Sequence, residues 1–414
     1  MEFRDLGNEK SMNDENLITG NAKVVRSINR AMILNIIRTK QPIPRTEIAK
    51  ITGLNKSTVS SIVNDLLQEE LINEQVKSDQ NVGRNPVDLY LRKNKYLTGA
   101  INIDVAKTRM AIVDIDGSII DTSVISTDPG NPEKFIKSCL REVRNLCKRM
   151  KIDQLEGLGI NIAGIVDSRN CIVNYAPNLG WEDFNIGKVI RKSWPELKVL
   201  VIGNDAKSSA LAELWFGAYE VNLSNFVSVS VGSGIGSGIV VENKLLDGEF
   251  QASGEFGHIT IIEGGELCSC GNNGCWEKYA SDRATVKRYT ERKTLKGATS
   301  QNEVISIETI IASALSNDSP ALEVLKETGY YLGLGITNII RSIDPQAVIL
   351  SGKITQAWDI IYPEIIKVVR ERAFFGKERN ILILLSSLGD RSRLLGAATL
   401  VIKEIFDCYR ITTE

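Results

Sequence analysis

The residues best suited to chemistry are the single histidine of the chain, His258, and three of its seven cysteines, Cys268, Cys270 and Cys275. Thiolate sulfur and imidazole nitrogen are typical ligands of Zn²⁺, and together these four groups complete a tetrahedral shell. A shell filled by protein leaves no position for an activated water, so we expect a structural zinc ion. The alternative is a cysteine-rich loop without metal. Because the only histidine lies within the same eighteen residues, we favour zinc.

A second group of polar residues could bind the hydroxyl groups of a sugar. Carboxylates and amides form the paired hydrogen bonds that polyol recognition needs. The candidates are Asn178, Asn204, Asp205, Glu255, His258 and Glu277. Any one of them is more often a cap or a surface residue, and Asp205 could simply cap a helix that begins at Ala206.

From residue 96 onward, predicted strands alternate with helices, which indicates an α/β domain. Strands are expected over 97–105, 109–115, 119–126, 157–163, 199–202, 226–231, 235–240 and 347–350, and helices over 132–150, 206–216, 307–315, 321–343 and 394–408. A hairpin followed by βα units, and then repeated, describes two similar lobes with a cleft between them. We expect the metal and sugar residues around that cleft.

Three turns at strand ends could bring backbone N–H groups close to phosphates. They follow Asp104, span residues 231–236 and span residues 350–352, and the last two contain glycine. Each of them alone is more often an ordinary turn.

The N-terminal part predicts a winged helix-turn-helix domain over residues 21–95, after a polar tail over 1–20 that we expect to be mobile. Apolar residues at helical spacing, beginning with Val25 and Ile28, predict a helix over 24–40. A short helix over 45–52 ends at Gly53, and a third helix follows with Asn55 or Ser57 as its cap. A hairpin-like wing follows over residues 73–92.

This domain offers polar groups for DNA. The second helix of such a pair enters the major groove by its N-terminal residues, and an arginine in the wing can reach a narrow minor groove. The candidates are Arg45, Asn55, Lys56, Ser57, Thr58, Ser60 and Arg84. Residues 23–95 hold 13 Lys and Arg against seven Asp and Glu, whereas the whole chain has a net charge of -1. The alternative is a small helical bundle for protein contacts.

The composition of the chain indicates the cellular compartment in which the protein is found. There is no apolar run long enough to span a membrane, and the N-terminus lacks the apolar core of a signal peptide. The other four cysteines are scattered, which favours free thiols over a disulfide framework. We expect a cytoplasmic protein.

The run from Glu255 to Glu277 resembles the signature of the ROK family, which groups bacterial sugar-responsive repressors with sugar kinases. It reads Glu-Phe-Gly-His and then Cys-Ser-Cys-Gly-Asn-Asn-Gly-Cys-Trp-Glu. Residues 232–238 resemble the family's second phosphate loop, residues 344–352 its adenosine-side strand and residues 176–181 its sugar-side loop. Within the family, residues 52–60 and the run ending at Ser281 are most similar to xylose-responsive repressors of Gram-positive bacteria.

The resemblance implies a winged-helix domain followed by a two-lobed, actin-like (RNase H-like) sugar domain over residues 96–414, assembled as a homodimer. It places Asn204, Asp205, Glu255, His258 and Glu277 at sugar-contacting positions and Asn178 more loosely. Asp205 matches the general base of the kinases.

The first phosphate loop departs from the family's kinases. They carry Asp-x-Gly-Gly-Thr, whereas this chain has Asp104-Val105-Ala106-Lys107-Thr108. Side chains at Ala106 and Lys107 would crowd the phosphates of ATP and disfavour backbone angles that glycine permits. We therefore expect no enzymatic activity.

Two functional hypotheses follow. The first is a repressor that binds palindromic operator DNA as a dimer and is released by a sugar, with D-xylose favoured and glucose the nearest competitor. The second is an ATP-dependent sugar kinase with an additional N-terminal domain. The DNA-binding pattern and the missing glycines favour the repressor.

Overall fold

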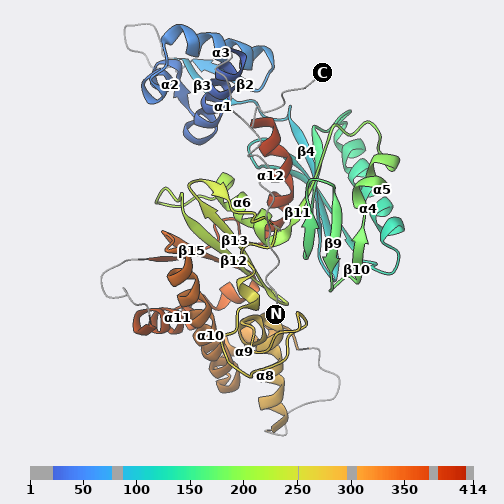
Figure 1. Ribbon diagram of the computed structural model, residues 1–414, viewed down its shortest axis with the longest axis vertical. Coiled ribbons are helices and arrows are strands. Elements are labelled where there is room, and N and C mark those ends of the chain that lie inside the picture. Colours follow the sequence, from blue (N-terminus) through green and yellow to red (C-terminus); the bar gives the residue numbers. More distant parts are fainter. Residues whose placement is uncertain (1–21, 77–86, 250, 296–304, 373–380, 407–414) are drawn as a thin grey trace, which may run out of the picture. The chain divides into compact units, whose positions relative to one another are not determined.

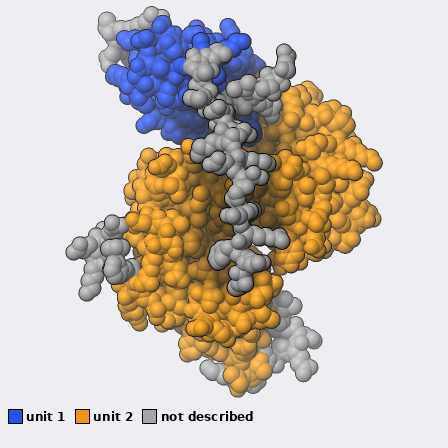
Figure 2. All heavy atoms as spheres, viewed as in Figure 1, with its two compact units in different colours: residues 1–92, 404–414 blue, residues 93–403 orange. Residues whose placement is uncertain are grey.

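The computed structural model describes residues 22–76, 87–249, 251–295, 305–372 and 381–406 (Figure 1). The expected tail over residues 1–20 and the expected wing tip with Arg84 lie outside these ranges. The chain forms two compact units, residues 1–92 with 404–414 and residues 93–403, which Figure 2 colours separately. Within the described ranges, no helix has the length and hydrophobicity needed to span a bilayer.

Unit 1 contains the predicted winged helix-turn-helix. Helices α1 (Ala22–Lys40), α2 (Arg45–Thr52) and α3 (Lys56–Gln68) precede strands β2 (Ile72–Val76) and β3 (Val87–Leu91), and the short strand β1 (Ile43–Pro44) pairs with β3. Gly53 ends α2 in a left-handed conformation with φ of 69°, and its N–H donates to the carbonyl of Ala49. This cap allows the chain to turn directly into α3.

The buried face of α1 is shorter than its sequence pattern predicts. Val25 and Ile28, which the pattern assigns to the apolar stripe, are 48% and 43% exposed. The buried residues of α1 are Ile33, Leu34 and Ile37. Its N-terminal half forms ion pairs from Arg26 to Asp65 on α3 and from Arg30 to Glu69, the residue that follows α3. Thus only the second half of α1 contributes to the apolar core.

The first lobe of unit 2 is built on a five-stranded sheet. The strands β4 (Leu97–Ile103), β5 (Lys107–Asp114) and β6 (Ile119–Ser126) form an antiparallel meander, and β7 (Gly157–Ile162) and β11 (Val199–Asn204) run parallel to β4, in the order β11-β7-β4-β5-β6. The other elements of this lobe are α4 (Pro132–Met150), α5 (Ile186–Ser193) and the small sheet of β8 (Ile165–Asp167), β9 (Ile172–Ala176) and β10 (Trp181–Phe184).

The second lobe repeats this topology. The strands β12 (Phe226–Val231), β13 (Ile235–Val241) and β14 (Lys244–Leu245) are antiparallel neighbours, and β15 (Ala347–Ser351) and β16 (Leu382–Leu385) extend the sheet parallel to β12. Its helices are α7 (Glu277–Ala280), α8 (Asp282–Leu295), α9 (Ile307–Leu315), α10 (Ser319–Ile343) and α11 (Trp358–Arg372). Helix α6 (Asp205–Phe216) contacts strands of both large sheets, and α12 (Ser392–Phe406) follows β16. The expected two-lobed α/β architecture is confirmed.

The strand directions explain where a site can form. In each large sheet the parallel strands end at the same edge, and loops at the carboxyl ends of parallel strands are the usual ligand-binding positions of such sheets. The residues that follow β4, β7, β11 and β12 are Asp104, Ala163, Asp205 and Gly232. These strand ends place the loops that the sequence singled out on one side of each lobe.

Candidate binding cleft and metal centre

A cavity of about 300 Å³ lies at these strand ends within unit 2. All six expected sugar-binding residues line it, namely Asn178, Asn204, Asp205, Glu255, His258 and Glu277. They come from the turn between β9 and β10, the junction of β11 with α6, and the loop that runs from β14 to α7. Residues up to 99 positions apart in the sequence thus share one cavity.

Asn204 and Asp205 have different tasks at the start of α6. The side-chain oxygen of Asn204 accepts hydrogen bonds from the N–H groups of Ala206 and Lys207, and its Nδ2 donates to the carbonyl of Gly164. Asn204, rather than Asp205, is therefore the cap of this helix. The Asp205 side chain, only 14% exposed, is left to face the cavity.

Glu255 lies among other acids in the cavity wall. Burial raises the pKa of its carboxyl above the ordinary value although part of the side chain remains exposed in the cavity. His258 and Lys207 oppose this rise, whereas the negative charges of Asp205 and Glu277 add to it. Three acids so placed can accept hydrogen bonds from several hydroxyl groups of one ligand.

The buried Lys207 fixes the loop that leads to Glu255. Its Nζ donates to the carbonyl oxygens of Asp247 and Gln251 at 2.9 and 2.8 Å. Burial lowers the pKa of Lys207, and Asp247 and Glu255 oppose that change. Sequence reasoning missed this lysine because a single basic residue within a helix carries no motif.

The four predicted metal ligands converge in space. The candidate ligand atoms of His258, Cys268, Cys270 and Cys275 all lie within 4.8 Å of one another. The Nδ1 atom of His258 is 3.6 Å from the Cys268 sulfur, and the sulfurs of Cys270 and Cys275 are also 3.6 Å apart. Tetrahedral zinc bonds of about 2.0 to 2.3 Å place ligand atoms about 3.5 to 3.8 Å apart, so the donor set fits a metal ion of this kind.

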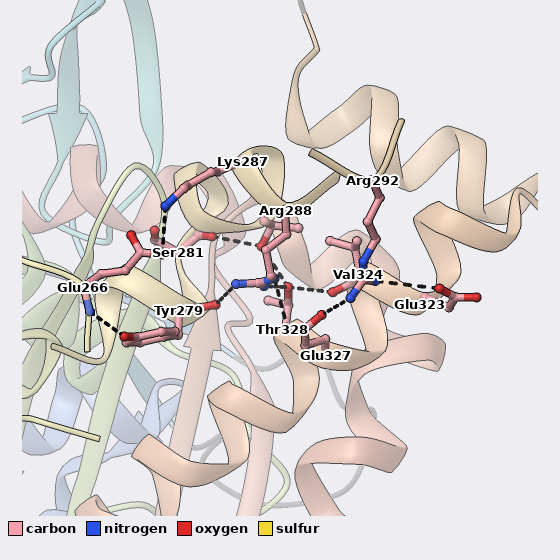
Figure 3. Close-up of polar contacts among 11 residues, drawn as sticks. Glu266, Tyr279, Ser281, Lys287, Arg288, Arg292, Glu323, Val324, Glu327 and Thr328 are labelled. Atoms are coloured by element: carbon pink, nitrogen blue, oxygen red, sulfur yellow. Dashed lines mark hydrogen bonds and ion pairs between the residues drawn. The ribbon is translucent and has the colours of Figure 1, made fainter. Parts of the chain in front are cut away.

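The cysteine loop is held in place by a polar network, shown in Figure 3. The hydroxyl of Tyr279 accepts a hydrogen bond from the N–H of Glu266 at 2.7 Å. The guanidinium of Arg288 on α8 donates to the carbonyl of Tyr279 and to the hydroxyl of Thr328 on α10, both at 2.6 Å. Lys287 also pairs with Glu266. Two helices of the second lobe thus anchor the backbone on both sides of the cysteines.

Arg393 is a further residue of the cavity that the sequence did not reveal. Its guanidinium lies 3.6 Å from carboxylate oxygens of Asp104 and Asp205, and it donates to the hydroxyl of Ser230 at 2.8 Å. The expected C-terminal helix begins at Leu394, two residues later than α12 (Ser392–Phe406), so Arg393 belongs to no predicted element. It is the second residue of α12.

The turn after β4 also borders the cavity, through Asp104 and Val105. The side-chain Oδ1 of Asp104 accepts a hydrogen bond from the N–H of Val105 at 2.7 Å. The hydroxyl of Thr127 donates to the backbone carbonyl of Asp104 at 2.6 Å. The N–H of Thr127 donates to the carbonyl of Ala106. This turn is therefore held by local hydrogen bonds that use its own carbonyl groups.

In unit 1, the predicted DNA contacts lie around the start of α3. Asn55, Lys56 and Ser57 are exposed, and Thr58 and Ser60 are half-buried. Asn55 occupies the cap position of α3 without a side-chain hydrogen bond to the helix. Arg45 is paired with Glu74 at 2.7 Å and donates to Asn64 at 3.0 Å, so its guanidinium is already engaged.

Fold and site together define a winged helix-turn-helix domain joined to an actin-like, two-lobed domain of the sugar-kinase fold. Residues 98–404 match the model of the ROK family, and residues 27–80 match that of the MarR family. The chain belongs to the ROK family.

Three relatives illustrate this membership. The xylose repressor of Bacillus spizizenii is 33% identical over 389 residues, which cover 94% of this chain and 98% of that protein. The crystal structure of a ROK family transcriptional regulator, a homologue of the E. coli MLC protein, has a TM-score of 0.79 and 26% identity, covering 93% of this chain and 97% of that one. A ROK family glucokinase from Streptomyces griseus, solved with glucose and AMPPNP, has a TM-score of 0.65 and 28% identity over 73% of this chain and 98% of that one.

Proposed function

We propose that this protein is a transcriptional repressor that a sugar releases from its operator DNA. The observation that carries the proposal is that one chain holds both a winged helix-turn-helix unit and a cavity lined by six side chains that can form hydrogen bonds with a polyol. The similarity to the xylose repressor of Bacillus spizizenii covers nearly the whole chain and supports this combination. D-Xylose is the effector that we propose, and glucose is the competitor to exclude.

For DNA recognition, the start of α3 would contact base edges in the major groove. Its exposed residues Asn55, Lys56 and Ser57 can donate and accept hydrogen bonds there, with Thr58 and Ser60 beside them. Arg45 could contact phosphate after leaving Glu74, and Arg84 is proposed for the minor groove. A homodimer would place two such helices on a palindromic operator.

In the cavity, Asp205, Glu255 and Glu277 would accept hydrogen bonds from sugar hydroxyls, while Asn204 holds the start of α6 and Asn178 borders the ligand. Binding can weaken the DNA complex only if the two states of the protein differ in sugar affinity. Because the cavity has walls from both lobes, a change in lobe spacing would change its contacts with the sugar and so would produce such a difference.

We also propose that the cysteine cluster holds structural zinc and that the metal orients the sugar site. The Nδ1 atom of His258 faces the sulfurs, which leaves Nε2 for a sugar hydroxyl. Cys270→Ala should therefore reduce the zinc content and weaken sugar binding more than DNA binding. Metal analysis, calorimetry and gel shifts on the same preparation measure all three. Equal loss of sugar and DNA binding would instead indicate a purely structural brace.

A sugar kinase is the second candidate, because Asp205 lines the cavity and resembles the general base of the family's kinases. The side chains of Ala106 and Lys107 replace the bare backbone that would surround the phosphates of ATP. We therefore expect no sugar-dependent ADP release. Turnover near the ~1 to 100 s⁻¹ typical of kinases, abolished by Asp205→Asn, would establish the kinase instead.

The decisive experiment for the proposed function is a gel shift with DNA from the promoter region of the chain's own gene. We expect a specific complex at moderate salt that D-xylose dissociates and that Lys56→Ala weakens. A specific complex that D-xylose, D-glucose and related sugars leave unchanged would contradict the proposal that a sugar is the effector. Failure to form any specific complex would contradict the proposed DNA-binding function itself.

A further inference from the structure

Arg393 occupies an unusual position in the cavity, because one side chain contacts three elements. It lies near Asp104 on the turn after β4, near Asp205 at the start of α6 and against Ser230 on β12. Asp104 belongs to the first lobe and Ser230 to the second. The guanidinium therefore bridges the two lobes at the edge of the proposed sugar site.

The backbone that carries this side chain is fixed to the first lobe. The carbonyl of Arg393 accepts a hydrogen bond from Nδ2 of the buried Asn161 on β7 at 2.6 Å. Helix α12 packs directly on β7, since a Cβ atom at Gly159 would lie 1.8 Å from the carbonyl oxygen of Ala397. It also packs on α6, since a Cβ atom at Gly396 would lie 2.5 Å from the carbonyl oxygen of Ser208. Only the side chain of Arg393 is left to move.

The ion pairs of Arg393 are loose enough for a ligand to replace the arginine at the carboxylates. Both carboxylates are 3.6 Å from the guanidinium, which is beyond the 2.7 to 2.9 Å of a tight charged hydrogen bond. The side chain is 29% exposed, so water and ligand can reach it. A sugar hydroxyl that donates to Asp205 would compete with Arg393 for the same carboxylate.

We infer that Arg393 is an interlobe tie that stabilises the sugar-free arrangement of the cleft and that a sugar bound at Asp205 releases. This inference rests on the proposed function and names the residue that responds to the ligand.

The tie is tested by two variants that break it at different contacts. Arg393→Gln removes the charge that faces Asp104 and Asp205, and Ser230→Ala removes only the bond to the second lobe. Arg391→Gln is the matched control, because it removes the same charge from an exposed position two residues away. D-Xylose and D-glucose affinities are measured by calorimetry, and operator affinity without sugar by gel shift.

If the tie favours the sugar-free state, breaking it must strengthen sugar binding and weaken operator binding. We expect Arg393→Gln to lower the sugar Kd about five-fold or more and to raise the operator Kd by a similar factor, with Ser230→Ala acting in the same direction and Arg391→Gln unchanged. Unchanged affinities in Arg393→Gln would overturn the inference. So would weaker sugar binding with unchanged operator binding, since Arg393 would then only position Asp205.

Sugar and operator affinities that stay unchanged in Ser230→Ala would overturn the inference that Arg393 ties the two lobes together. The wild-type protein separates these outcomes from failure of the proposed function. If it binds sugar but no operator, the repressor function is wrong, and the sugar affinities of Arg393→Gln and Ser230→Ala still test the tie.

Discussion

Asp282 is a half-buried acid beside the glycine-bearing loop after β12, and its raised pKa predicts that the stability of the protein depends on pH. Its N–H donates to the carbonyl of Gly232, while its side-chain Oδ1 is buried without a hydrogen-bond partner among the described residues. Burial raises the pKa of Asp282 to about 7, the charge of Glu308 adds to this, and Lys353 and Arg393 oppose it. The folded protein therefore favours the neutral acid.

This shift predicts the effect of Asp282→Asn. A raised pKa in the folded state means that stability falls as the pH rises from about 4 to 7, at about 1.4 kcal/mol for each pKa unit. The variant should therefore match wild type at or below about pH 4 and exceed its stability by a few kcal/mol at pH 8. Urea unfolding followed by tryptophan fluorescence reports on unit 2, which holds all five tryptophans. Parallel pH profiles of the two proteins would contradict this prediction.

At the residue level, the sequence could predict the groups with distinctive chemistry. His258, Cys268 and Cys275 stood out because thiolates and imidazole at short spacing are rare by chance. Arg393 and Lys207 could not be predicted, because their roles arise from partners more than thirty positions away in the chain. No local pattern marks such contacts.

Among the elements, α12 depends on its close packing against β7. Because a Cβ atom at Gly159 would meet the carbonyl oxygen of Ala397 at 1.8 Å, Gly159→Ala must push the helix away from the strand. We expect a loss of about 1 to 3 kcal/mol in the free energy of unfolding, measured by urea titration of tryptophan fluorescence. Gly130→Ala is the control, since the nearest atom there is 3.5 Å away. Equal stability of the two variants would show that α12 adjusts without cost.

Local sequence signals explain which helices and strands could be predicted and which could not. The range of α4 was predicted from Pro132 to Met150, because Asn131 caps it, Pro132 begins it and its apolar face has a clear helical period. The short strands β8, β9 and β10 were missed, since three to five residues carry too little periodicity. Helix α8 was also missed, because charged residues occur on all its sides and its stability comes from contacts such as Arg288 with Thr328.

In the molecule as a whole, the proposed function requires that sugar and operator affect each other equally. If D-xylose lowers operator affinity by a given factor, thermodynamic linkage requires that saturating operator lowers D-xylose affinity by the same factor, which for typical allosteric proteins is about 5 to 150. Calorimetric titration of D-xylose into the protein with operator DNA, and with unrelated DNA of equal length as control, measures this directly. Equal sugar affinity in both titrations, together with operator release by the sugar, would mean that the sugar site detected by calorimetry is not the site that causes release, which would contradict a role of the cavity around Asp205 as the effector site.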